Sequence, residues 1–246
     1  MFGVANHRSI AWAIAQILHG AGAKLAIAYQ NERVRDTVAK LVAPWGDGLV
    51  LECDVSSDRN VEQAYETVRQ RFEGLDMIVH SIAFANREDL GGTFVETGRE
   101  GFRLALDISA YSLVPIARYG APLMREGGGS ILTMTFQAAN RVFPGYNVMG
   151  TAKAALENEV RQLAADLGRD NIRVNAISAG PLDTLSSRAI SQYRDMKRIH
   201  AERSPMRRNI TADEVAKTAL FLCSGLSSGV TGEIVHVDTG YNIMGI

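Results

Sequence analysis

The chain has 246 residues, of which 46% are hydrophobic and 22% are charged, and its formal net charge is −1. This composition is typical of a globular protein and argues against a disordered chain, a nucleic-acid partner or a membrane-surface partner. No apolar run reaches the roughly 18 residues of a transmembrane helix, and Cys53 and Cys223 lack the spacing of a disulfide framework or a metal site.

The first motif in the chain is a glycine-led turn, residues 3–9, which leads into a helical pattern that begins at Ile10. A helix N-terminus offers unpaired N–H groups and the positive end of a dipole, so it suits a pyrophosphate. The full G-x-G-x-x-G fingerprint is absent, and an ordinary helix capped by Ser9 is the alternative interpretation. Gly3, Ser9 and Ile10 are therefore candidates for cofactor binding.

Six short apolar runs predict β-strands, and helical patterns occupy the spaces between them. The runs do not alternate cleanly with polar residues, which is typical of a sheet covered on both faces. Residues 61–72 and 149–167 have apolar side chains at three- and four-residue steps, as amphipathic helices do. Thr211 and Glu214 form a capping-box pattern at the start of a helix that ends near Cys223. The predicted strands cover residues 24–29, 48–53, 77–81, 130–135, 173–178 and 233–237.

Strand–helix alternation without a linker, a repeat or a low-complexity tract predicts one α/β domain, residues 1–246. We expect a single doubly wound, Rossmann-type parallel sheet flanked by helices. Only Met1 and Phe2 precede the first turn, so the first, central strand is expected to be truncated, because a typical strand has about five or six residues. Ligands bind beyond the carboxyl ends of the strands in such a sheet, so the residues after each strand are the candidate site.

Gln30, Asp54 and Val55 follow the predicted strands at 24–29 and 48–53. The carboxylate of Asp54 and the backbone of Val55 could hold an adenine edge, or Asp54 could help to cap the next helix. Gln30 stands where folds that select NAD often place an acid for the ribose hydroxyl. Because Gln30 is neutral, the preference between NADH and NADPH stays open.

Tyr146 and Lys153 are the candidates for catalysis. On a helix, seven residues turn through about 700° and rise about 10.5 Å, so both side chains would lie on one face and could converge on a ligand between them. An ammonium near a phenol lowers the phenol's pKa from about 10 and favours its role as an acid. A buried tyrosine and a surface lysine on an amphipathic helix form the alternative interpretation.

With these motifs, the chain resembles the short-chain dehydrogenase/reductase superfamily, and in particular its divergent branch, the enoyl-[acyl-carrier-protein] reductases. The divergent signature Tyr-x-x-Met-x-x-x-Lys is matched by Tyr146, Met149 and Lys153. The resemblance covers essentially the whole chain at closely similar spacings. It also rests on the turn from Gly3 to Trp12, on Cys53-Asp54-Val55, and on residues 80–85, 107–109, 178–181 and 228–238.

The resemblance implies reduction of the trans-2 double bond of an enoyl thioester on acyl carrier protein, the last reductive step of each fatty-acid elongation cycle. NADH, with NADPH as the alternative, would give hydride to the β-carbon, and charge would build on the thioester oxygen. Tyr146 would donate its hydroxyl to that oxygen, and Lys153 would hold the nicotinamide ribose and stabilise the charge. A homotetramer and a cytoplasmic location are expected from the same resemblance.

The same resemblance assigns the remaining site residues. The substrate would lie beside Ala85, Phe136 and Tyr146, under a lid formed by about residues 185–205. The cofactor-binding residues would be Gly3, Ser9, Ile10, Gln30, Asp54, Val55, Ile82, Lys153, Leu182, Asp183, Thr184, Leu185 and Ser186.

Two positions depart from the family's pattern. Phe136 replaces a tyrosine that many relatives carry ten residues before the catalytic one, which removes a hydroxyl beside the substrate. Asp183 stands where a basic residue is frequent, and a carboxylate there repels a pyrophosphate unless it is paired or turned away.

Two alternatives to an enoyl reductase stay open. The first is another short-chain reductase that acts on a carbonyl. The usual signature of such enzymes, Tyr-x-x-x-Lys, would require a tyrosine at the position of Met149, which argues against this alternative. The second is a catalytically impaired scaffold, suggested by the truncated first strand and by Asp183.

Overall fold

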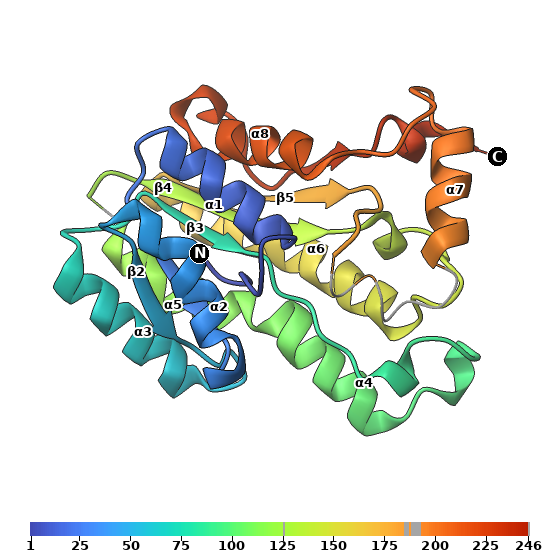
Figure 1. Ribbon diagram of the computed structural model, residues 1–246, viewed down its shortest axis with the longest axis horizontal. Coiled ribbons are helices and arrows are strands. Elements are labelled where there is room, and N and C mark those ends of the chain that lie inside the picture. Colours follow the sequence, from blue (N-terminus) through green and yellow to red (C-terminus); the bar gives the residue numbers. More distant parts are fainter. Residues whose placement is uncertain (125, 185–186, 188–192, 246) are drawn as a thin grey trace.

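The computed structural model describes residues 1–124, 126–184, 187 and 193–245, in which strands and helices alternate (Figure 1). The predicted strands are all found, with ends displaced by two residues or fewer. Within the described residues, no helix is long and apolar enough to cross a membrane. The strands are β1 (Ala26–Tyr29), β2 (Leu49–Glu52), β3 (Met77–His80), β4 (Gly129–Thr135), β5 (Ile172–Ala179) and β6 (Ile234–Val237). The α-helices are α1 (Ile10–Gly20), α2 (Glu32–Val42), α3 (Asp58–Arg71), α4 (Arg99–Leu106), α5 (Leu113–Gly120), α6 (Val148–Leu167), α7 (Tyr193–Arg203) and α8 (Ala212–Cys223).

The paired strands of the sheet run parallel, as expected for a doubly wound fold. β1 pairs with β2, while β3, β4, β5 and β6 pair in that order. Phe2 joins the two parts through single bridges to Ala28 in β1 and His80 in β3. The Phe2 N–H donates to the Val79 carbonyl at 2.8 Å, and the Met1 carbonyl accepts from the Ala28 N–H at 2.9 Å. This two-residue segment occupies the place predicted for the truncated central strand.

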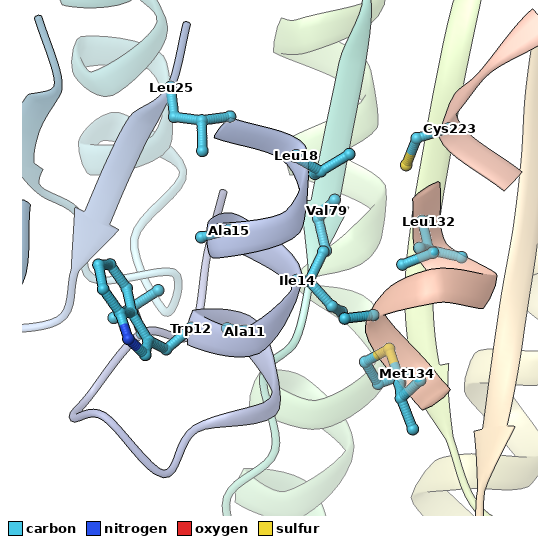
Figure 2. Close-up of a cluster of buried hydrophobic side chains, with 14 of the residues drawn as sticks. Ala11, Trp12, Ile14, Ala15, Leu18, Leu25, Val79, Leu132, Met134 and Cys223 are labelled. Atoms are coloured by element: carbon cyan, nitrogen blue, oxygen red, sulfur yellow. The ribbon is translucent and has the colours of Figure 1, made fainter. Parts of the chain in front are cut away.

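The sheet is covered by helices on both faces. Val79 and Leu132 contribute to the core under α1, α2 and α8, whereas their neighbours Ile78 and Ile131 contribute to the core under α3, α5 and α6. Figure 2 shows the first of these cores, in which Ile14 of α1 lies against the sheet. Because helices cover both faces, the strands are largely apolar without a clean alternation of polar residues, as in other parallel sheets.

Helix α8 begins at the predicted capping box. The Thr211 hydroxyl accepts the Glu214 N–H at 3.2 Å, and the Glu214 carboxylate accepts the Thr211 N–H at 2.8 Å. Arg208 adds an ion pair to the same carboxylate at 2.6 Å. The hydrogen bond from Arg208 and those from Thr211 lower the pKa of Glu214 to about 2. The local sequence therefore determines where the helix that packs against α1 begins.

Candidate active site

A cavity of about 510 Å³ lies beyond the carboxyl ends of the strands. Its volume is within the range of about 300–1,000 Å³ that is usual for small-molecule sites. Residues from separate predicted motifs line this cavity. This agrees with the expectation that ligands bind beyond the carboxyl ends of parallel strands. The predicted residues that line it are Gly3, Ser9, Ile10, Gln30, Val55, Ile82, Ala85, Phe136, Tyr146, Lys153, Leu182 and Thr184.

The turn before α1 forms one wall of the cavity. Gly3 has a φ of +101°, and a Cβ there would lie 2.0 Å from the Ser81 carbonyl oxygen, so only glycine fits. The Ser9 hydroxyl accepts the N–H groups of Ala5 and Asn6, each at 3.1 Å, and makes no side-chain cap bond to α1. Ser9 therefore holds the turn closed, which brings the unpaired N–H groups at the start of α1 to the cavity.

Asp54 does not line the cavity, although we expected it to bind cofactor. Its carboxylate accepts hydrogen bonds from the Ser56 N–H at 3.0 Å and the Ser56 hydroxyl at 2.9 Å. The neighbours Cys53 and Val55 line the cavity instead. An aspartate that bonds two residues ahead stabilises a turn, so Asp54 serves the loop between β2 and α3.

Asp183 is the second predicted cofactor residue that does not line the cavity. Its carboxylate pairs with the Lys197 ammonium of α7 at 2.5 Å, and its side chain is 74% exposed. The Lys197 ammonium thus offsets the negative charge of Asp183. Because the carboxylate is paired, it repels a pyrophosphate less than a free carboxylate would. Two further predicted residues, Leu185 and Ser186, lie outside the described residues.

Tyr146 lies in a turn, not on a helix. Helix α6 begins at Val148, and Asn147 before it has a φ of +40°, outside the helical range. The Asn147 side-chain amide donates to the Gly91 carbonyl, which stabilises the turn from outside. The prediction that Tyr146 and Lys153 share a helical face about 10.5 Å apart is therefore wrong. Their side chains reach the same cavity from a turn and from a helix.

Burial controls the ionisation of Tyr146. It raises the pKa of the phenol above its ordinary value, and the neighbouring Tyr193 adds to the increase. The predicted lowering of this pKa by Lys153 is therefore not found: the shift is upward, and Lys153 is not among its causes. The phenol keeps its proton at neutral pH, so its hydroxyl is available as a hydrogen-bond donor.

Lys153 projects from α6 toward the end of β4. Its side chain is 4% exposed, and the ammonium donates to the Met134 carbonyl at 2.8 Å. Burial lowers the pKa of Lys153 from 10.5 to about 8, and the charge of Glu157 opposes this decrease. The ammonium therefore remains mostly protonated at neutral pH, close to the point where it titrates.

A buried histidine lies beneath this part of the site. The two ring nitrogens of His80 are each 2.8 Å from a hydroxyl oxygen, that of Thr133 on one side and that of Ser112 on the other. Burial, with a contribution from the Lys153 charge, lowers the pKa of His80 to about 3. His80 is thus neutral under ordinary conditions and supports the sheet without competing for protons with Lys153.

An irregular helical segment holds another wall in place. Residues Asp107–Tyr111 form a π-helical turn, within which the Ser109 hydroxyl bonds to both the N–H and the carbonyl of Phe84 at 2.9 Å. Hydrophobic periodicity does not reveal such a turn, and residues 107–109 entered the sequence analysis only as part of the family resemblance. Lining residues beyond the predicted set include Cys53, Ser81, Phe84, Leu90, Ile108, Met134, Thr135, Met149, Ala179, Gly180, Pro181, Ser187, Tyr193 and Met196.

Helix α7 falls within the predicted lid at residues 185–205. Tyr193 and Met196 line the cavity, and the Tyr193 hydroxyl donates to the Leu182 carbonyl. A smaller cavity of about 220 Å³ adjoins the first, and Phe136 and Met196 line both. Before Tyr193, Ser187 is the described part of the predicted lid.

The residues around the cavity fit a dinucleotide. The turn of residues 3–9 presents the N-terminus of α1, which suits a pyrophosphate. The Lys153 ammonium has three N–H donors, of which the Met134 carbonyl accepts one, so donors remain for ribose hydroxyls. Within the described ranges, no group of three or more His, Cys, Asp or Glu side chains could hold a metal ion.

Comparisons with known proteins agree with this geometry. A family model described as "Enoyl-(Acyl carrier protein) reductase" matches residues 3–242. The chain is 50% identical to the "Enoyl-[acyl-carrier-protein] reductase [NADH] FabI" of Bacillus cereus, over 100% of this chain and 96% of that protein. The solved Bacillus cereus reductase with NADP+ and indole naphthyridinone superposes with a TM-score of 0.97 at 50% identity, covering 100% of this chain and 96% of that one. The reductase of Anaplasma phagocytophilum in complex with NAD gives a TM-score of 0.95 at 44% identity, covering 100% and 93%.

Proposed function

The chain belongs to the family of the enoyl-(acyl carrier protein) reductases, and we propose that it reduces the trans-2 double bond of an enoyl thioester carried by acyl carrier protein. A reduced nicotinamide, NADH with NADPH as the alternative, supplies the hydride when it is bound. The observation that carries the proposal is that Tyr146 and Lys153 line one cavity with the turn of residues 3–9.

Tyr146 donates its hydroxyl to the thioester oxygen. Negative charge develops on this oxygen as hydride reaches the β-carbon, so the hydrogen bond is stronger in the transition state than in the ground state. Because burial raises the pKa of Tyr146, the hydroxyl is protonated when it is needed. A fixed donor that faces developing charge in a buried site lowers the barrier to the reaction.

Lys153 holds the ribose next to the reacting atoms and contributes positive charge. Its ammonium is fixed by the Met134 carbonyl, so the remaining N–H groups have a restricted direction. Positive charge close to the thioester oxygen stabilises the same transition state that Tyr146 stabilises. Lys153 therefore links cofactor binding to the reaction.

The other lining residues divide between cofactor and substrate. Ala85, Phe136 and Tyr146 all line the cavity, and we assign them to the substrate. Asp54 and Asp183, which do not line the cavity, are left out of the cofactor set. The residues proposed to bind the cofactor are Gly3, Ser9, Ile10, Gln30, Val55, Ile82, Lys153, Leu182 and Thr184.

One assay tests the proposal against its alternatives. The absorbance of NADH and of NADPH is followed with a crotonyl thioester and, separately, with an acetoacetyl thioester. Oxidation of the cofactor by the crotonyl thioester alone supports an enoyl reductase. Oxidation by the acetoacetyl thioester alone indicates a carbonyl reductase. If neither thioester is reduced and neither cofactor binds, the chain is a scaffold and the proposal fails.

The organisation of the protein around this site is also a proposal. Residues 1–246 act as a single domain, and the described part of the predicted lid, which includes α7, lies on the acyl-chain side of the cavity. The family resemblance further supports a homotetramer and a cytoplasmic location. Analytical ultracentrifugation checks the assembly, and cell fractionation checks the location.

A further inference from the structure

Glu157 is a buried carboxylate that the proposed chemistry does not use. Its side chain is 3% exposed, and it lies four residues after Lys153 on α6, one helical turn away. Glutamate is almost never fully buried unless it has a partner, because an ionised carboxylate loses its hydration there. A buried carboxylate beside a residue of the active site therefore requires an explanation.

Two consecutive residues at the end of β4 hold Lys153 and Glu157. The Met134 carbonyl accepts a hydrogen bond from the Lys153 ammonium at 2.8 Å, and the Thr135 hydroxyl donates to the Glu157 carboxylate at 2.9 Å. The Asn140 side-chain amide donates to the second carboxylate oxygen at 3.4 Å. Lys153 and Glu157 are thus hydrogen-bonded to adjacent residues at the end of β4. These bonds restrict the rotation of both side chains.

Glu157 also supplies the negative charge that acts on Lys153. Burial lowers the pKa of Lys153 to about 8, and Glu157 is the group that opposes this decrease. The other titratable groups near the ammonium or around the cavity have pKa values that keep them neutral near pH 8. Among the described residues these groups are His80 from β3, Tyr146 from the turn before α6, Cys53 after β2 and Tyr193 from α7.

We propose that Glu157 is a positioning residue for Lys153, which keeps the buried ammonium charged and fixed against the end of β4. The role of Lys153 in holding the cofactor rests on the proposed function, whereas the effect of Glu157 on Lys153 does not. Glu157 acts through Lys153 and lies outside the set of residues that line the cavity.

The first test is the pH dependence of NADH affinity in the Glu157→Gln variant. In the wild type, we expect affinity to fall as Lys153 loses its proton, with a midpoint near the Lys153 pKa of about 8. Without the carboxylate charge, this midpoint moves down by about one pH unit, and the affinity below pH 6 is unchanged. Glu159→Gln is the matched control, because Glu159 is a partly buried acid of the same helix with no described link to Lys153.

The second test reads the ionisation of Lys153 without any enzymatic activity. Acetic anhydride acylates neutral amines, so mass spectrometry of the acylated protein gives the reactivity of Lys153 relative to the exposed Lys24. At pH 6.5, a downward shift of the Lys153 pKa by one unit from about 8 increases this ratio about eightfold in Glu157→Gln. If the wild type does not reduce a crotonyl thioester, the proposed function fails, and this ratio still decides the role of Glu157.

Two results would overturn the proposal. One is a midpoint and a labelling ratio in Glu157→Gln that match those of Glu159→Gln. The other is an equal loss of NADH affinity at every pH, which indicates a purely structural role. If Glu157→Gln does not fold, Glu157→Asp replaces it. The shorter side chain moves the carboxylate away from Lys153, so the pH midpoint of NADH affinity should still fall. An unchanged midpoint overturns the proposal.

Discussion

The ring of Phe136 meets the ring of Tyr146 edge to face, with centroids 5.1 Å apart and an angle of 62° between the planes. Phe143 also packs against Phe136, with ring centroids 4.7 Å apart. Because Tyr146 lies before α6, helical neighbours do not hold its side chain. Packing against Phe136 thus orients the phenol of Tyr146, for which we propose the role of donor to the substrate.

We expect Phe136→Leu to lower kcat with little effect on NADH affinity. An aromatic pair contributes about 0.5–1.5 kcal/mol beyond its buried area, so the loss in kcat is roughly 2- to 12-fold. Steady-state kinetics with a crotonyl thioester and NADH titration by fluorescence measure the two quantities. Phe143→Leu, which touches Phe136 and not Tyr146 in these ring pairs, is the control. An equal effect of both variants on kcat argues against orientation by Phe136.

We expect Tyr146→Phe to lower kcat by about 10²- to 10³-fold, the usual cost of removing one donor to a developing oxyanion. NADH affinity should change less than threefold, as the hydroxyl serves the substrate. Tyr193→Phe is a matched control, because Tyr193 lines the same cavity but donates its hydroxyl to the Leu182 carbonyl. Losses of kcat and NADH affinity by the same factor would remove Tyr146 from its proposed role.

We expect Gly3→Ala to destabilise the protein by roughly 2–4 kcal/mol and to abolish most NADH binding. The added Cβ would meet the Ser81 carbonyl oxygen at 2.0 Å, in addition to the strain of a positive φ. Gly22→Ala is the control, since Gly22 has a similar φ of +94° with no atom within 4 Å of the new Cβ. Urea unfolding should show a smaller loss there, of roughly 1–2 kcal/mol, and unchanged NADH affinity. Equal losses in both variants would mean that the close approach to Ser81 is unimportant.

We expect His80→Gln to reduce the loss of folding stability that occurs when the pH falls. The folded pKa of His80, about 3, is lower than the ordinary 6.5, so below pH 6.5 the unfolded chain binds a proton that the folded chain does not. Stability due to His80 is therefore lost as the pH falls from 6.5 toward 3, by about 1.4 kcal/mol per pH unit. A glutamine does not titrate, so between pH 6.5 and 5.0 the variant should lose about 1.6 kcal/mol less than the wild type, since the unfolded histidine is only half protonated at pH 6.5.

Urea unfolding at each pH measures this difference. The exposed His236 provides the control variant, His236→Gln. The same change of slope in both variants would contradict the assignment of the effect to buried His80.

The amino-acid sequence by itself determined the order of strands and helices, the parallel sheet and the family. These features depend on local patterns: apolar runs, periods of three and four residues, and the capping box at Thr211 and Glu214. The same patterns predicted twelve site residues that line one cavity in the structure. These residues meet because the carboxyl ends of parallel strands lie at one edge of the sheet.

Only the tertiary structure decided how charges and rings are paired. Asp183 is neutralised by Lys197, fourteen residues away, and Tyr146 leaves the helix because Asn147 adopts a positive φ. The desolvation that raises the pKa of Tyr146 and lowers that of Lys153 depends on atoms contributed by distant segments. Sequence spacing shows which residues can meet, whereas burial and the identity of the neighbour determine their ionisation, and both of these arise only when the chain is packed.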